Sequence, residues 1–183
     1  MPVTIGKQKE HGFDQPLGLL SDCHRRIEMF LGVLVRVAEE GRGLPLTERQ
    51  RDAVQKALRY FREAAPKHTA DEEESLFPRM RELESAEVAN ALRQVDALEK
   101  DHRRAEELHA ECDSLFREWD YEGRLPAYKE ARLREVMAEL ARVYADHIRT
   151  EDQVIFPLAG RLLDQDSQAA VGREMAARRG MLR

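Results

Sequence analysis

Histidine and glutamate recur four residues apart along this chain, and no other spacing in it is better suited to chemistry. Four of the six histidines are followed by a glutamate at this distance. In an α-helix, residues four apart lie one turn apart on one face, so each pair offers an imidazole and a carboxylate to the same neighbour. Both groups bind transition metals. The pairs are His24 and Glu28, His68 and Glu72, His102 and Glu106, and His147 and Glu151.

These pairs belong to an internal repeat. The segments that begin at His68 and His147 both read H-x-x-x-E-x-x-x-[LI]-F-P, and those at His24 and His102 share H-R-R-x-E. Corresponding histidines lie 79 residues apart in the first case and 78 in the second. We therefore expect one helical hairpin used twice, with the two copies related by a pseudo-twofold axis.

The candidate ligands share helix faces with apolar residues, which predicts that they point into a core. Leu20, Ile27 and Leu31, for example, lie on the stripe of His24. Carboxylates that converge in an apolar core repel one another and would partly protonate, whereas two divalent cations remove that cost. The pattern thus favours a two-metal site. Taken singly, each histidine could instead be a hydrogen-bonded core residue, and each pair a surface ion pair.

Helix-start and helix-stop residues delimit the elements that would carry the pairs. They predict an all-α fold, an up-down-up-down four-helix bundle with a short extra C-terminal helix. As domains, we expect an N-terminal arm over 1–14, the bundle over 15–163, and the short helix and tail over 164–183. The first expected helix runs from Pro16 to about Glu40, and the second from the Thr47–Gln50 capping box to Phe77-Pro78, with a break at Pro66. The third runs from the Ser85 cap to about Asp120, and the fourth from Ala127 to Leu163 with a kink at Pro157. The short fifth helix begins at Ser167.

The order H … H-x-x-x-E … H … H-x-x-x-E, with L-F-P and I-F-P after the second and fourth motifs, resembles the hemerythrin-like (HHE cation-binding) family over about residues 15–160. The resemblance implies two iron ions in the bundle, joined by an oxo or hydroxo bridge and by two bridging carboxylates. On this chain it implies terminal ligation by His24, His68, His102 and His147, and bridging by Glu72 and Glu151.

Glu106 departs from the oxygen-carrying members of that family, which have a histidine at this position. We predict that Glu106 is a terminal ligand of the iron held by the second hairpin. Glu28, its counterpart in the repeat, is predicted to ligate or directly adjoin the iron of the first hairpin, with an ion pair to a nearby arginine as the alternative. Mixed imidazole and carboxylate ligation favours iron over zinc.

Other polar residues lie near the motifs. Tyr144, three residues before the last motif, could be a hydrogen-bond or one-electron partner of the centre, or a buried structural tyrosine. His109 falls on the face of His102 and could be a channel residue or a plain hydrogen-bonded histidine. Glu73 and Glu74 fall on other faces and are interpreted as solvated.

Composition and charge limit the classes of function. The 183 residues carry a net charge of -5 with scattered basic residues, which disfavours a nucleic-acid surface. No run of about 18 apolar residues and no signal-peptide core occurs, so we expect neither a membrane span nor export. Cys23 and Cys112 have no framework spacing and are predicted to be free thiols in a reducing, cytoplasmic environment.

Together these observations favour a non-haem di-iron protein that performs redox chemistry on peroxide, dioxygen or nitric oxide, with peroxidase-like or catalase-like activity as its enzymatic form. The alternative is reversible oxygen binding, or sensing of oxygen or iron, without turnover. Anionic ligands such as Glu106 favour a resting ferric state, because a negative donor stabilises the more highly charged ion. The sequence indicates no partner besides these small molecules and does not specify the oligomeric state.

Overall fold

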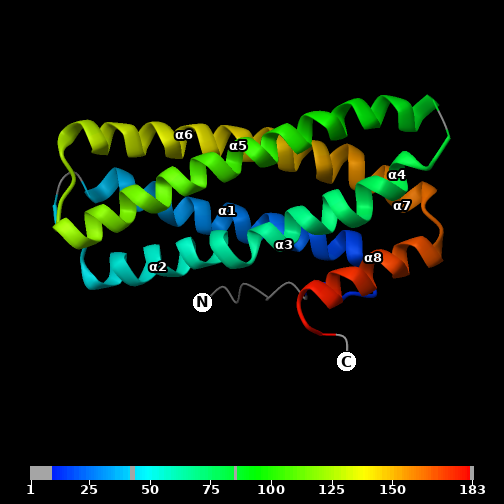
Figure 1. Ribbon diagram of the computed structural model, residues 1–183, viewed down its shortest axis with the longest axis horizontal. Coiled ribbons are helices and arrows are strands. Elements are labelled where there is room, and N and C mark those ends of the chain that lie inside the picture. The colour runs from blue at the N-terminus through cyan, green and yellow to red at the C-terminus, as the bar shows by residue number, and fades with distance from the viewer. Residues whose placement is uncertain (1–9, 42–43, 85, 182–183) are drawn as a thin grey trace, which may run out of the picture.

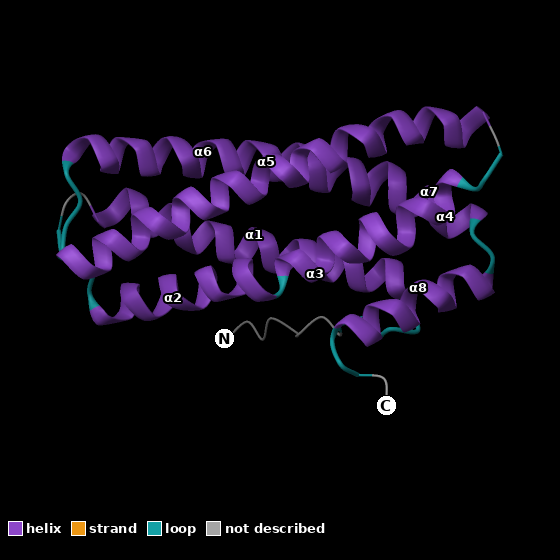
Figure 2. Ribbon diagram, in the orientation of Figure 1, coloured by secondary structure: helices purple, strands orange, loops and turns teal. Residues whose placement is uncertain are grey.

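A computed structural model of the protein describes residues 10–41, 44–84 and 86–181. Its regular elements are α1 (Pro16–Gly41), α2 (Glu48–Glu63), α3 (Ala65–Ala70), η1 (Asp71–Leu76), α4 (Phe77–Arg81), α5 (Ala86–Glu122), α6 (Ala127–Thr150), η2 (Glu151–Ile155), α7 (Phe156–Leu162) and α8 (Gln165–Arg178) (Figure 1). All of these are helical, which confirms the predicted all-α class (Figure 2). Within the described ranges, no helix combines the length and the apolar character that crossing a membrane requires.

The long helices lie along the long axis of the molecule and form a helical bundle. In Figure 1, α1, the run from α2 to α4, α5, and the run from α6 to α7 extend in this direction. They pack on one another, because α1 contacts α2 and α6, and α5 contacts α4 and α6. The connections between α1 and α2, between α4 and α5, and between α5 and α6 lie at the ends of the molecule (Figure 2). Helix α8 packs against the side of the bundle, on η1 and α1.

Local signals set several helix ends as predicted. Thr47 and Gln50 form the reciprocal capping box that opens α2. The break at Pro66 is also present, since α2 ends at Glu63 and Pro66 lies in the first turn of α3. The predicted cap at Ser85 and the arm before residue 10 lie outside the described residues. The division into arm, bundle and C-terminal helix stays a prediction.

Two predicted ends differ from the structure. The second helical run does not stop at the F-P dipeptide but continues to Arg81. Pro78 lies in the first turn of α4, a position that tolerates a residue without an N–H. Helix α8 begins at Gln165 rather than Ser167, because Asp164 caps it and accepts a hydrogen bond of 2.7 Å from the Ser167 N–H.

A polar layer divides the apolar core into two clusters. The first cluster includes Ile27, Leu34, Phe61, Leu108, Trp119 and Ile148, and the second includes Leu20, Phe77, Met80, Val95, Phe156 and Met175. The layer contains buried side chains that would be costly in an apolar core without partners. They are His24, His68, Glu72, His147 and Glu151.

Helix α8 is fastened to η1 through a buried carboxylate. The Asp71 side chain is fully buried and accepts hydrogen bonds from Arg178 at 3.0 Å and from Arg179 at 2.6 Å. Arg178 also donates to the exposed Glu74 at 3.1 Å. Burial raises the pKa of the Asp71 carboxyl, although both arginines act in the opposite direction. The charge on Asp71 therefore depends on Arg178, the last residue of α8, and on Arg179, which directly follows it.

Replacing Arg179 with alanine should destabilise the fold by about 2 kcal/mol near neutral pH, because the buried Asp71 carboxylate then keeps only one arginine. The loss should shrink as the pH is lowered. A carboxyl whose folded-state pKa is raised favours the folded state in its protonated form, and this contribution is lost as pH rises. Urea unfolding at several pH values measures the effect.

The control for this experiment is Arg161→Ala, which removes an exposed ion pair with Glu87. It should cost less than about 1 kcal/mol at any pH, because exposed pairs contribute little. If the loss of unfolding free energy in Arg179→Ala does not vary with pH, then the Arg179 side chain stabilises the fold only through its packing.

Candidate metal centre

Two short π-helical segments carry the central carboxylates. Segment η1 follows α3, and η2 follows α6. In each segment, the phenylalanine five residues after the glutamate donates its backbone N–H to the carbonyl of that glutamate, Phe77 to Glu72 and Phe156 to Glu151. The prolines that follow have no N–H and cannot extend the α-helical hydrogen bonds. Such π turns within α-helices are rare and are frequent at functional sites. Here they coincide with the repeated E-x-x-x-[LI]-F-P.

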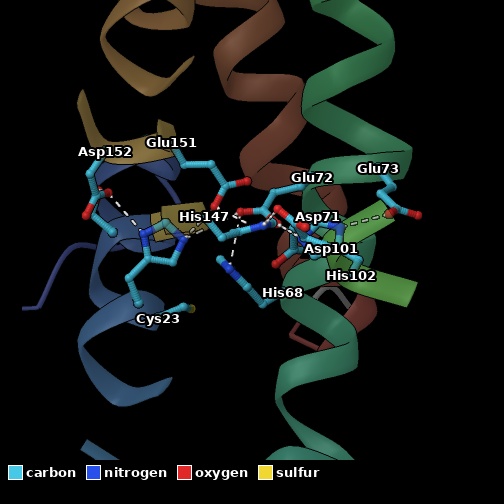
Figure 3. Close-up of polar contacts among 12 residues, drawn as sticks. Cys23, His68, Asp71, Glu72, Glu73, Asp101, His102, His147, Glu151 and Asp152 are labelled. Carbon is cyan, nitrogen blue, oxygen red and sulfur yellow. Dashed lines mark hydrogen bonds and ion pairs between the residues drawn. The ribbon is translucent and has the colours of Figure 1, made fainter. Parts of the chain in front are cut away.

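Six of the eight predicted ligands come together in the polar layer. They form two groups whose ligand atoms all lie within 4.8 Å of one another in each group. Figure 3 shows Glu72 and Glu151 reaching toward each other among the imidazoles. Both glutamates belong to both groups, so the arrangement suits two ions that share two carboxylates. The groups are His24, His68, Glu72 and Glu151, and Glu72, His102, His147 and Glu151.

Each shared carboxylate contacts one histidine of its own helix and one of the other hairpin. Glu72 Oε1 lies 3.2 Å from His68 Nε2, and its Oε2 lies 3.3 Å from His102 Nε2. Glu151 makes the equivalent contacts through one oxygen, since its Oε2 lies 3.1 Å from His147 Nε2 and 3.0 Å from His24 Nε2. The pairing of residues, though not of atoms, has the symmetry that the repeat predicts, because the carboxylate of each hairpin contacts a histidine of the other hairpin.

The inner polar atoms of the centre are buried without hydrogen-bond partners in the described part of the chain. This holds for all four carboxylate oxygens of Glu72 and Glu151, and for Nε2 of His24 and of His102. A buried neutral group left in this way costs about 1–3 kcal/mol, and a charged group costs more. Metal ions would satisfy these nitrogen and oxygen atoms together, so the residues present fit a metal centre.

Further carboxylates hold the outer nitrogen of two imidazoles. His24 Nδ1 lies 3.0 Å from Asp152, which also accepts a hydrogen bond from Ser21. His102 Nδ1 lies 2.8 Å from Glu73. An imidazole that donates from Nδ1 keeps Nε2 free for a metal. Glu73 was expected to be solvated, and this expectation is wrong. The repeat could have indicated this role of Glu73, because Glu73 and Asp152 each directly follow one of the two shared glutamates.

The other two imidazoles have weaker outer contacts. His147 Nδ1 lies 3.7 Å from Asp101, which is an ion-pair distance rather than a hydrogen bond. His68 Nδ1 is buried and has no hydrogen-bond partner among the described residues. Glu74 is exposed, as expected, and pairs with Arg178. The four imidazoles therefore differ in how strongly hydrogen bonds to Nδ1 fix their orientation.

Imidazoles compensate the carboxylate charge when protons take the place of metal. Burial opposes charge on His24, but nearby carboxylates, Asp152 foremost, outweigh it and raise its pKa to about 12. Burial also opposes charge on His102, yet Glu72 raises its pKa to about 9. Burial favours protonated carboxyls at Glu72 and Glu151, but the imidazoles overcome it and lower both pKa values. The expectation that these carboxylates take up protons is therefore wrong, because each one faces imidazoles.

Glu28 and Glu106 do not join the centre, contrary to prediction. Both are exposed, and neither belongs to a ligand group. Four residues advance an α-helix by about 400°, so the glutamate lies about 40° to one side of the histidine, and on α1 and α5 this side is exposed. On α1 and α5 the buried position after the histidine is three residues on, at Ile27 and Ala105. Only the helices that change to a π turn bury the residue four positions on.

Tyr144 and His109 form a hydrogen-bonded pair near the centre. Tyr144 Oη lies 2.9 Å from His109 Nε2, and the His109 ring stacks on Phe61 with 4.0 Å between centroids. Burial lowers the pKa of His109 to about 4 and raises that of Tyr144. Both rings are therefore neutral near neutral pH, and His109 belongs to neither of the two ligand groups found among the described residues.

Asp152→Ala should weaken metal binding by about 10- to 100-fold, because the His24 ring loses the acceptor that orients it. Competition with a chromophoric chelator measures the affinity. Asp146→Ala is the control, since Asp146 is an exposed residue of α6 that pairs with Arg149. Equal affinities for the two variants would show that Asp152 has no orienting role.

Known proteins agree with this description of the site. Residues 15–159 match the family described as Hemerythrin HHE cation binding domain. The chain is also similar to an uncharacterized protein of Haemophilus influenzae, with 25% identity over 167 residues that cover 91% of each chain. The family match includes all six converging residues and ends before α8. The order of motifs, the shared carboxylates and this match agree, and the chain belongs to the hemerythrin HHE cation-binding domain family.

Proposed function

We propose that the chain is a non-haem di-iron protein. The observation that carries the proposal is the pair Glu72 and Glu151, which both ligand groups share and whose four carboxylate oxygens are buried without hydrogen-bond partners among the described residues. Iron is favoured over zinc, because structural zinc sites are often built from cysteines and neither ligand group contains one, whereas a shared imidazole and carboxylate set suits iron. In this proposal one ion is held by His24 and His68, the other by His102 and His147, and Glu72 and Glu151 bridge them.

The proposal includes an up-down-up-down four-helix bundle over 15–163, with the two hairpins related by a pseudo-twofold axis. The contacts of the centre support it. Glu72 pairs with His68 of its own helix and His102 of the other hairpin, and Glu151 pairs in the same way with His147 and His24. Antiparallel neighbours joined by short loops are the usual way to bring such residues together in a bundle core.

When bound, an iron pair supplies or accepts electrons in chemistry with peroxide, dioxygen or nitric oxide. The surrounding residues favour the ferric state. Asp152 and Glu73 accept hydrogen bonds from ligand imidazoles and so increase the donor strength of those rings. Stronger, more negative donors stabilise the more highly charged ion. This argument replaces the one from Glu106, which lies outside the ligand groups. A ferric resting state disfavours reversible oxygen carriage, which needs the ferrous state, and favours consumption of peroxide with an external reductant that supplies the two electrons.

The cysteines are compatible with such chemistry in a reducing compartment. Cys23 and Cys112 are free and buried, as predicted. Burial raises the pKa of both thiols, so they stay protonated and react slowly with oxidants. Since free thiols are typical of intracellular proteins, we infer that the protein is cytoplasmic.

The chain purified from iron-replete cells should contain about two irons, and Glu151→Ala should remove about half of this iron or more, because it deletes a ligand shared by both ions. Metal analysis of the purified variants gives the answer. Glu106→Ala is the matched control: it has the same spacing from its histidine but is exposed, so it should keep both irons. One zinc per chain without iron uptake would refute the di-iron proposal, and loss of iron from Glu106→Ala would make Glu106 a ligand.

The iron-loaded protein should consume hydrogen peroxide in the presence of a reductant and should oxidise in air to a stable ferric form. Peroxide loss and oxygen release are measured together with the absorption spectrum, and Glu151→Ala serves as the inactive control. The carrier alternative predicts the opposite result. It requires an oxygen adduct that persists for hours and is released on degassing, while peroxide is left untouched.

A further inference from the structure

A cavity of about 490 Å³ adjoins one side of the metal centre. All four ligand histidines line it, whereas Glu72 and Glu151 do not. A water molecule occupies about 30 Å³ of liquid volume, and an apolar cavity of about 150 Å³ already holds benzene. The cavity is therefore much larger than a peroxide, a dioxygen molecule or the ions themselves require. Its size is that of a site for a small organic molecule.

The cavity lies on the side of the first apolar cluster. Its buried apolar lining residues all belong to that cluster, and none belongs to the second. Tyr144 and His109 complete this wall, but their hydrogen bond to each other leaves a neutral surface. The wall therefore suits an apolar body. The apolar residues are Ile27, Leu58, Phe61, Ala65, Ala105 and Ile148.

The exposed rim of the cavity carries charges of both signs. Arg62 and Asp113 form an ion pair with a separation of 3.4 Å. Arg103 and Glu106, which also line the cavity, contribute one further positive and one further negative charge. Glu73, a third carboxylate of the lining, is engaged by His102 Nδ1 at 2.8 Å. The other four charges balance, so the rim has no excess of free positive or negative charge. A neutral molecule meets no uncompensated charge on its way to the histidines.

We propose that this cavity binds a small neutral organic molecule with an apolar body about the size of one benzene ring and a single oxygen function, such as a hydroperoxide or an alcohol. The apolar body lies against the first cluster, and the oxygen function faces the histidines. That orientation rests on the proposed di-iron function, whereas binding itself does not. The inference adds small neutral organic molecules to the ligands of the site, because such a molecule would reach the four histidines through the cavity.

Benzyl alcohol is a redox-inert probe of this shape. Isothermal titration of the purified chain, with iron and after chelation, should give one-to-one binding with a Kd of about 1 mM or lower in both forms. In the metal-free chain, where no iron can bind the probe's carboxylate, benzoate and benzylammonium, which have nearly the same size but carry a charge, should bind at least about tenfold more weakly. Nuclear Overhauser contacts from the ring protons to the methyl groups of Leu58 and Ile148 should locate the probe.

Ala65→Leu should weaken benzyl alcohol binding at least about tenfold, because the larger side chain fills the cavity beside Phe61. Ala131→Leu, the same change on the exposed face of α6, is the matched control and should bind as the unaltered chain does. The proposal is overturned if the unaltered chain shows no saturable binding, if the charged probes bind equally well, or if the contacts lie elsewhere. Failure of the iron proposal leaves these results unchanged, because binding is also measured without metal.

Discussion

Two carboxylates buried in an apolar core are the constraint on which the rest of this structure depends. Glu72 and Glu151 have no exposed surface, and a buried carboxylate without compensation costs several kcal/mol even after relaxation. Each long helical run contributes one imidazole that lies beside these carboxylates and offsets this cost. Asp152 and Glu73 in turn form hydrogen bonds with two of these imidazoles. The carboxylates raise the pKa of His24, so a protonated imidazole offsets part of their charge when no metal does, whereas burial lowers the pKa of His68 to about 4.

The sequence predicted the local features and missed those that depend on a change of helix type. The His/Glu repeat, the apolar stripes beside the histidines and the capping box can all be recognised from residue spacing in an α-helix. Thr47, for example, caps α2 as expected. The same H-x-x-x-E spacing, however, leaves Glu28 exposed and Glu72 buried. The difference is the π turn, which requires a hydrogen bond five residues back and has no period of its own in the sequence. It also re-aims Glu73, which ideal α-helical geometry assigns to solvent but which contacts His102.

The repeat governs the ligands but not their surroundings. Asp71, which precedes Glu72, is buried and bonded to the arginine that ends α8 and to the one that directly follows it. Thr150 precedes Glu151 at the equivalent position, is partly exposed, and donates its hydroxyl to the Asp146 carbonyl at 2.9 Å. His68 also lacks the outer carboxylate contact that His147 has. The two ligand groups therefore have chemically different surroundings, and the difference arises partly from α8, which lies outside the region of the family match.

Support and access come from opposite sides of the centre. Val171 and Met175 of α8 belong to the second apolar cluster, which packs beside η1 and η2 and contains Phe77 and Phe156. The cavity lies instead within the first cluster and meets the histidines. Helix α8 contacts η1, which carries Glu72, yet none of its residues lines the cavity. The side of the centre that α8 supports is therefore distinct from the side on which the four imidazoles face the cavity.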